Sequence, residues 1–312
     1  MNILETPPVA QVDRRPLLGY SIYLLAAALF ALNGTVAKYI LINGVPWTRV
    51  SQLRVTAAFL LLVLVVAITR PTALRLRRSE IVPLALYGIL GIAVTQSLYL
   101  VSIQRLPVGV SLLFEFTAPI MVALWFRFVM HEPVRDRVFL ALVLAMIGLA
   151  MVAQVWHGLS LDLIGVLAAL AAAVALAFYF LEGEKLVRHR DPVSLTMWGF
   201  GFASAFWAIV CPWWSFPWEL MSFTAAFGEG GPVLPGWGYA TYMILFGTVI
   251  PFALVLQSLR HLRATQASVV GMSEPVIASV IAWIFLGEVL TPIQMVGGAV
   301  VLVGIVLAET SR

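Results

Sequence analysis

The stretch that decides the fold is LPVGVSLLFEFTAP at residues 106–119, because a related stretch, LRATQASVVGMSEP, recurs at residues 262–275. Four pairs of residues share one offset of 156 positions: Leu106 and Leu262, Pro119 and Pro275, Glu132 and Glu288, and Gly148 and Gly304. A fixed offset over this distance indicates an internal duplication. The sequence therefore predicts two similar halves, residues 17–156 and residues 163–309, after an N-terminal tail of residues 1–16.

The composition is that of an integral membrane protein. Hydrophobic residues make up 62% of the 312 positions and charged residues 11%, and the mean hydropathy is +0.99. Soluble domains are roughly half apolar and about a quarter charged, so a bilayer explains this composition better than a soluble core does. The chain has a single cysteine, Cys211, and its four histidines lack metal-ligand spacing. We expect neither a metal nor a cofactor.

Ten apolar runs are long enough to be membrane spans of about 20 residues. They cover residues 17–40, 50–69, 82–103, 107–130, 138–156, 163–183, 194–216, 237–258, 265–286 and 292–309. Five spans per half make the second half enter the membrane from the opposite side. The predicted fold class is an all-α integral membrane protein of ten transmembrane helices, arranged as two inverted five-helix repeats. Residues 217–236 are expected to form an interfacial loop.

The basic residues set the orientation, because Lys and Arg are retained on the cytoplasmic side of a membrane. With ten spans and both termini cytoplasmic, 15 of the 19 basic residues fall on that side. The exceptions are Lys38, Arg49, Arg54 and Arg105. We therefore expect a multi-pass protein of the cell's inner (plasma) membrane.

Two glutamates within the predicted spans are the main functional candidates, since an ionisable side chain is costly there. Glu274 immediately precedes Pro275 in the ninth span, and Glu115 lies four residues before Pro119 in the fourth. Each proline loosens its helix, which near mid-membrane is tolerated only beside protein or a watery cavity. We expect both carboxylates to line a cavity between the halves and to bind an ammonium group, take up protons, or both. Alternatively, each glutamate merely pairs with a neighbouring arginine or a helix end.

The remaining polar residues in the spans are weaker candidates. Asn33, Gln96, Tyr99 and Gln257 could bond to a ligand or across helices. The charged residues Lys38, Arg54, Glu132 and Glu288 are expected to be structural. For Arg54 we favour an ion pair with a buried carboxylate. For Glu132 and Glu288 we expect helix capping or pairing with loop arginines.

These motifs resemble the drug/metabolite transporter superfamily, of the EamA type with ten helices. The resemblance rests on residues 106–109 (LPVG), 115–119 (EFTAP), 131–133 (HEP), 272–275 (MSEP) and 285–294 (FLGEVLTPIQ). Residues 102–109, followed by Glu115, resemble the threonine/homoserine exporter branch in particular. The resemblance implies a central cavity lined by the first, third, fourth, sixth, eighth and ninth helices, with Glu274, Glu115, Asn33, Gln96 and Tyr99 at or near it. No glutamate precedes Pro119, so the two halves are not expected to contribute equally.

The leading interpretation is a secondary transporter that exports amino acids or related metabolites by alternating access, with proton coupling or exchange. One alternative is a broad exporter of drugs and lipophilic cations, and another is a membrane sensor or scaffold without transport. An enzyme is not expected, because no cluster of acidic, histidine or serine–lysine residues lies near a headgroup region. The expected partners are a small-molecule substrate and lipid, without nucleic acid. The small residues on the fifth and tenth spans are also compatible with a homodimer.

Overall fold

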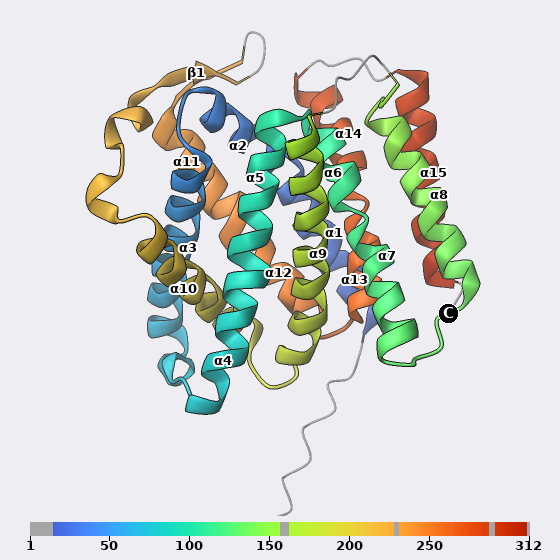
Figure 1. The fold of residues 1–312 in the computed structure, drawn as a ribbon, viewed down its shortest axis with the longest axis horizontal. Helices are drawn as coiled ribbons and strands as arrows, with labels where there is room; N and C mark the ends of the chain where they lie inside the picture. The colour runs from blue at the N-terminus through green and yellow to red at the C-terminus, as the bar shows by residue number, and fades with distance from the viewer. Residues whose placement is uncertain (1–14, 157–161, 228–230, 287–290, 311–312) are drawn as a thin grey trace, which may run out of the picture.

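The computed structural model describes residues 15–156, 162–227, 231–286 and 291–310, and almost all of its regular structure is helical (Figure 1). The first half comprises α1 (Pro16–Ala31), α2 (Asn33–Ile42), α3 (Trp47–Thr69), η1 (Pro71–Leu74), α4 (Arg78–Leu86), η2 (Tyr87–Val94), α5 (Thr95–Arg105), α6 (Val108–Glu115), α7 (Ala118–Leu124), η3 (Trp125–Val129) and α8 (Asp136–Val152). The second half comprises α9 (Leu163–Leu186), α10 (Pro192–Val210), η4 (Trp213–Ser215), η5 (Trp218–Ser222), β1 (Thr224–Ala226), β2 (Val233–Pro235), α11 (Gly236–Ile244), η6 (Leu245–Val249), α12 (Ile250–Ser258), α13 (Ala264–Gly271), α14 (Glu274–Leu286) and α15 (Pro292–Thr310).

Seven helical segments of the described chain are long and apolar enough to cross a membrane. They are Pro16–Ile42, Trp47–Thr69, Arg78–Arg105, Val108–Val129, Leu163–Leu186, Pro192–Val210 and Gly236–Ser258, and Pro292–Ala308 is a shorter apolar helix. Every predicted span coincides with a helical segment, which confirms a helical membrane protein. Ten crossings, the inverted orientation of the halves and the cytoplasmic termini remain predictions.

The helix bounds repeat with the same spacing as the sequence motifs. Helices α6 and α13 begin 156 residues apart and end 156 residues apart, and so do the starts of α7 and α14. The helix is interrupted at residues 116–117 in the first half and at residues 272–273 in the second. Each interruption ends just before a proline, because Pro119 and Pro275 lack the N–H that would continue the preceding helix. Both helices are therefore broken at equivalent positions of the two halves.

One break was not predicted. Residues 17–40 were expected to form one continuous helix, but the chain turns at Leu32 between α1 and α2. The next two residues are Asn33 and Gly34, and both residue types are poor helix formers. The break brings the start of α2 to the centre of the bundle, where Gly34 lies against the Tyr99 hydroxyl.

Helix α9 lies in the middle of the bundle, and α8 and α15 form a pair at its side (Figure 1). Asp162 caps the start of helix α9, because its carboxylate accepts a hydrogen bond of 2.8 Å from the backbone N–H of Gly165. That bond and the nearby Arg105 guanidinium lower the pKa of Asp162 below its usual value. Close packing of α8 on α15 depends on Gly148, where an added Cβ would lie 2.7 Å from the carbonyl oxygen of Gly297.

The loop expected at residues 217–236 is more ordered than an irregular segment. It contains η5 and a hairpin in which β1 pairs antiparallel with β2. The hairpin lies over the ends of α2 and α11 (Figure 1), where the Tyr239 hydroxyl donates to the carbonyl of Ala225 at 3.1 Å. Trp218 stacks between Trp213 and Trp237. Aromatic packing of this kind gives the connection between α10 and α11 a fixed shape.

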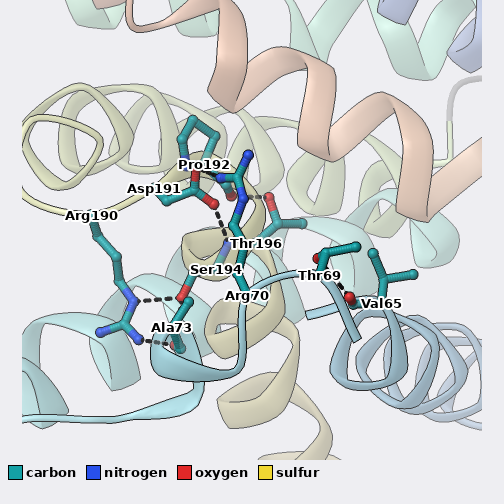
Figure 2. Close-up of polar contacts among 9 residues, drawn as sticks. All are labelled: Val65, Thr69, Arg70, Ala73, Arg190, Asp191, Pro192, Ser194 and Thr196. Carbon is teal, nitrogen blue, oxygen red and sulfur yellow. Dashed lines mark hydrogen bonds and ion pairs between the residues drawn. The ribbon is translucent and has the colours of Figure 1, made fainter. Parts of the chain in front are cut away.

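At the opposite end of the bundle, hydrogen bonds between basic and acidic loop residues join the two halves. Figure 2 shows Arg190 donating to the Ser194 hydroxyl and the carbonyl of Ala73, while Arg70 pairs with Asp191 at 2.5 Å. Arg263 of the second half pairs with Glu132 of the first at 2.9 Å. Loops predicted to be cytoplasmic thus meet at one end of the molecule.

Candidate functional site

A cavity of about 100 Å³ lies between the two halves. Its lining consists of aromatic, aliphatic and polar side chains, namely Tyr23, Phe30, Asn33, Arg54, Thr95, Gln96, Tyr99, Leu112, Glu115, Phe116, Leu176, Tyr179, Phe180, Phe252, Val255 and Glu274. All six helices named by the family resemblance contribute to it, and the second predicted span adds Arg54. The cavity is therefore an enclosed site with aromatic walls and charges of both signs.

Two carboxylates face this cavity from matching helices. Glu115 is the last residue of α6 and is 8% exposed, whereas Glu274 is the first residue of α14. Neither side chain forms a hydrogen bond or an ion pair with any residue that the structure describes. Two carboxylates that line one cavity repel each other, and a proton or a cation between them relieves that repulsion.

Arg54 supplies the opposite charge in the cavity. It lies on α3 and is only 2% exposed. Its Nε donates to the Thr248 hydroxyl at 3.0 Å, and its Nη2 donates to the carbonyl oxygen of Gly247 at 2.9 Å. Both acceptors belong to η6, a short π-helix, a type of helix that is frequent at functional sites. Arg54 forms no ion pair with the described residues, and these two hydrogen bonds hold it instead of the expected pairing with a carboxylate.

Several uncharged polar groups at the cavity lack partners. Asn33 Oδ1, Thr95 Oγ1 and both amide atoms of Gln96 form no hydrogen bond with the described part of the chain. A buried polar atom without a partner costs about 1–3 kcal/mol, so such atoms normally meet water or a ligand. These atoms line the same cavity as Arg54 and the two glutamates, so they are available to a polar ligand there.

Five predicted site residues lie together at this cavity: Glu274, Glu115, Asn33, Gln96 and Tyr99. The sixth, Gln257, is half-buried on α12 and is not part of the lining. The ligand roles of these residues remain predictions. Sequence reasoning missed Tyr23, Thr95 and Tyr179, which also line the cavity. The sequence signal that could have identified them is a hydroxyl-bearing side chain within an apolar span.

The predicted structural charges have separate partners. Lys38 on α2 donates from Nζ to the carbonyl oxygen of Leu106 at 3.0 Å, at the end of α5. Glu132 pairs with Arg263, one of the loop arginines considered for it. Glu288 lies outside the described residues.

A further buried carboxylate, Glu184, was not singled out from the sequence. It is 4% exposed and accepts a 2.8 Å hydrogen bond from the backbone N–H of Ala264, the first residue of α13. Arg188, four residues along α9, bonds its other oxygen at 2.7 Å. Glu184 therefore fixes the start of the broken helix that leads to Glu274. The Glu–Arg spacing of four residues on one helix was the signal in the sequence.

Comparison with known proteins identifies the family. The model of the EamA-like transporter family matches residues 17–154 and again residues 163–310. The chain belongs to the EamA-like transporter family. Its curated relatives include the threonine/homoserine exporter RhtA of Escherichia coli K12, 28% identical over 90% of this chain and 88% of that protein. An uncharacterized transporter of Archaeoglobus fulgidus is 25% identical over 70% of this chain and 75% of that protein.

Two further similar proteins extend the comparison. The uncharacterized inner membrane transporter YicL of Salmonella typhimurium is 21% identical over 91% of this chain and 92% of that protein. A solved crystal structure shares the fold with a TM-score of 0.71 at 18% identity, over 95% of this chain and 96% of that one. Membership of the EamA-like transporter family makes this protein a membrane transporter and points away from an enzyme.

Proposed function

We propose that this protein exports small amino compounds, amino acids foremost, by alternating access. The proposal depends on one observation: Glu115 and Glu274 face a shared cavity without an ion-pair partner among the described residues. A buried carboxylate needs a proton or a cation to offset its lost hydration. The ammonium group of an amino compound is such a cation. The similarity to an exporter named for threonine and homoserine supports both the direction and the substrate class.

Proton coupling follows from the same pair of carboxylates. When the ammonium group leaves, a proton takes its place between Glu115 and Glu274, and the next substrate displaces that proton. The broken helices α6–α7 and α13–α14 carry the two carboxylates at their breaks. Breaks of this kind let short helical pieces move relative to one another while the cavity opens to one side and then the other.

The membrane setting belongs to the same proposal. We assign the protein to the inner membrane, with both termini in the cytoplasm and a lipid environment around ten spans. A homodimer would need the outward apolar side chains of α15, among them Leu302, Val303 and Val306, which are exposed. The small residues Gly148, Gly297 and Gly304 are occupied in the contact between α8 and α15.

A second candidate function, export of lipophilic cations, is favoured by the aromatic lining of the cavity. Phe30, Phe180 and Phe252 lie in the walls, and aromatic faces attract cations. The buried charge of Arg54 opposes this reading because it repels a cation without an acidic group. Resistance of overexpressing cells to cationic dyes, without resistance to amino acids, would select this second function.

The deciding experiment measures efflux of labelled threonine and homoserine from cells that overexpress the protein. For Glu274→Gln we expect efflux to fall more than about tenfold, since loss of one member of a buried charge pair costs ~2–5 kcal/mol. Glu115→Gln is expected to reduce efflux as well. The matched control is Glu182→Gln, because Glu182 pairs with Lys185 at 2.7 Å and does not line the cavity. Wild-type efflux in both cavity variants would refute the proposal.

A further inference from the structure

We propose that Arg54 is the specificity-determining residue that binds an anionic group of the transported compound, so that the cavity selects zwitterions over plain amines. This inference rests on the proposed function, in which Glu115 and Glu274 receive the ammonium end. It adds a second recognition point in the same cavity.

The first observation is that Arg54 is buried without a compensating ion pair. At 2% exposure it has lost nearly all contact with bulk water. Its hydrogen-bond partners are a hydroxyl and a backbone carbonyl, both uncharged. A buried charge is stable only when it is well paired and hydrogen-bonded. An arriving carboxylate would complete the pairing that the described part of the chain leaves open.

The second observation is how the guanidinium is held. Thr248 and Gly247 of η6 accept from Nε and Nη2, and Thr248 is itself fixed by donating to the carbonyl oxygen of Met243 at 2.8 Å. A guanidinium has five N–H groups in a planar fork. The η6 contacts use two of them, which leaves donors for a carboxylate. Because η6 fixes the orientation of the plane, the arginine is prepared for binding before the ligand arrives.

The third observation is that the cavity carries charges of both signs. Arg54 lies in its lining together with Glu115 and Glu274. An α-amino acid carries its carboxylate and ammonium a short distance apart and fits this arrangement. Its carboxylate would meet Arg54, and its ammonium would meet Glu115 and Glu274.

The fourth observation concerns the space beside Arg54. Asn33 Oδ1 accepts no hydrogen bond from the described residues, and its side chain lies so close to Gly247 that a Cβ there would overlap it. Gln96 also offers an unpaired amide at the cavity. These groups can bond a hydroxyl or a carbonyl of the ligand next to its carboxylate. The same cavity then recognises both charges and one neutral polar group.

The test compares competitors in proteoliposomes that take up labelled threonine. The competitors are unlabelled threonine and 1-amino-2-propanol, which is threonine without its carboxylate. For the wild type we expect threonine to compete at least about tenfold better, since a buried charge-assisted contact is lost with the amine. For Arg54→Gln we expect this preference to disappear, because threonine weakens while the amine does not.

Two further variants keep the test decisive. Arg54→Lys keeps the charge but not the planar fork and should retain part of the preference. Thr248→Ala removes one support of Arg54 and should also reduce the preference, which covers the case in which Arg54→Gln does not fold. The matched control is Arg49→Gln, one and a half turns earlier on α3. Arg49 bonds Gln52 at 2.8 Å and Ser215 at 2.7 Å away from the cavity, so this variant should keep the wild-type preference.

The two proposals fail in different ways. Normal uptake by both Glu115→Gln and Glu274→Gln would overturn the proposed function and this inference together. An inactive Glu274→Gln, combined with a wild-type preference in Arg54→Lys and Thr248→Ala, would overturn the role of Arg54 alone.

Discussion

Glu115 and Glu274 lie on matching helices but are not equivalent residues. With an offset of 156, Glu115 corresponds to Gly271 and Glu274 to Ala118, so the two carboxylates enter the cavity one helical turn apart. Glu115 ends α6, where backbone carbonyls gather, whereas Glu274 begins α14, where free N–H groups favour a negative charge. The ammonium group should therefore depend more on Glu274 than on Glu115.

Close approach at single glycines shapes the cavity. A Cβ at Gly34 would lie 2.9 Å from Cγ1 of Val108 and would overlap the Tyr99 hydroxyl. We expect Gly34→Ala to displace Tyr99 and to lower threonine efflux several-fold, about the effect of 1–3 kcal/mol of overpacking. Gly109→Ala is the matched control, since its Cβ would meet Ala153 at an ordinary 3.6 Å. Equal efflux by the two variants would show that this contact does not matter.

At the level of elements, the broken helices are what carry the site. The breaks before Pro119 and Pro275 put Glu115 at a helix end and Glu274 at a helix start. The break at Leu32 does the same for Asn33 on α2. Glu184 then fixes the start of α13 by bonding Ala264.

The pair of α8 and α15 offers a prediction about stability. A Cβ at Gly148 would lie 2.7 Å from both the Gly297 carbonyl oxygen and the Val301 nitrogen, and neither backbone atom can easily move. We expect Gly148→Ala to lower the melting temperature in detergent, because overpacking of ~1–3 kcal/mol exceeds the gain of about 1 kcal/mol in helix propensity. Gly298→Ala is the control, since its Cβ would meet only a methyl group of Val276, at 3.3 Å. A Gly148→Ala protein as stable as the wild type would contradict this packing.

At the scale of the whole molecule, ion pairs hold the two halves together at the end where the basic loops meet. In the part of the chain that the structure describes, three ion pairs join them there: Arg70 with Asp191, Arg190 with Glu80, and Arg263 with Glu132. The last pair borders a second cavity of about 560 Å³, lined by Phe126 and Val138 from one half and by Thr265 and Gln266 from the other. This end of the molecule must separate for the central cavity to open there.

We expect charge reversal at the Glu132–Arg263 pair to open that end more often. In a Cys211→Ser background, Leu112→Cys reports access to the central cavity, because Leu112 lines it. With Glu132→Arg, labelling by a membrane-impermeant thiol reagent from the Arg263 side should quicken about two- to fivefold, since an exposed pair is worth ~0.2–1 kcal/mol. Adding Arg263→Glu should restore the original rate.

The control for this measurement is Glu182→Arg, which breaks the pair with Lys185. That pair lies within α9 and does not join the two halves, and Glu182 does not line the second cavity. The interpretation of the Glu132–Arg263 pair as a latch would be wrong if both single variants changed the labelling rate equally, or if neither changed it.

The sequence by itself determined the helical membrane class, the duplication and the family, because apolar runs, a fixed offset and local motifs are properties of neighbouring residues along the chain. It also indicated Glu115, Glu274 and Asn33 as cavity residues, since polar groups are conspicuous in an apolar span. Only the tertiary structure showed that Gln257 does not line the cavity. It alone also showed that Arg54 bonds Thr248 and Gly247 and that Glu184 fixes the start of α13. These contacts join residues 80 to 194 positions apart, and hydropathy and spacing carry no information about which distant helices pack together.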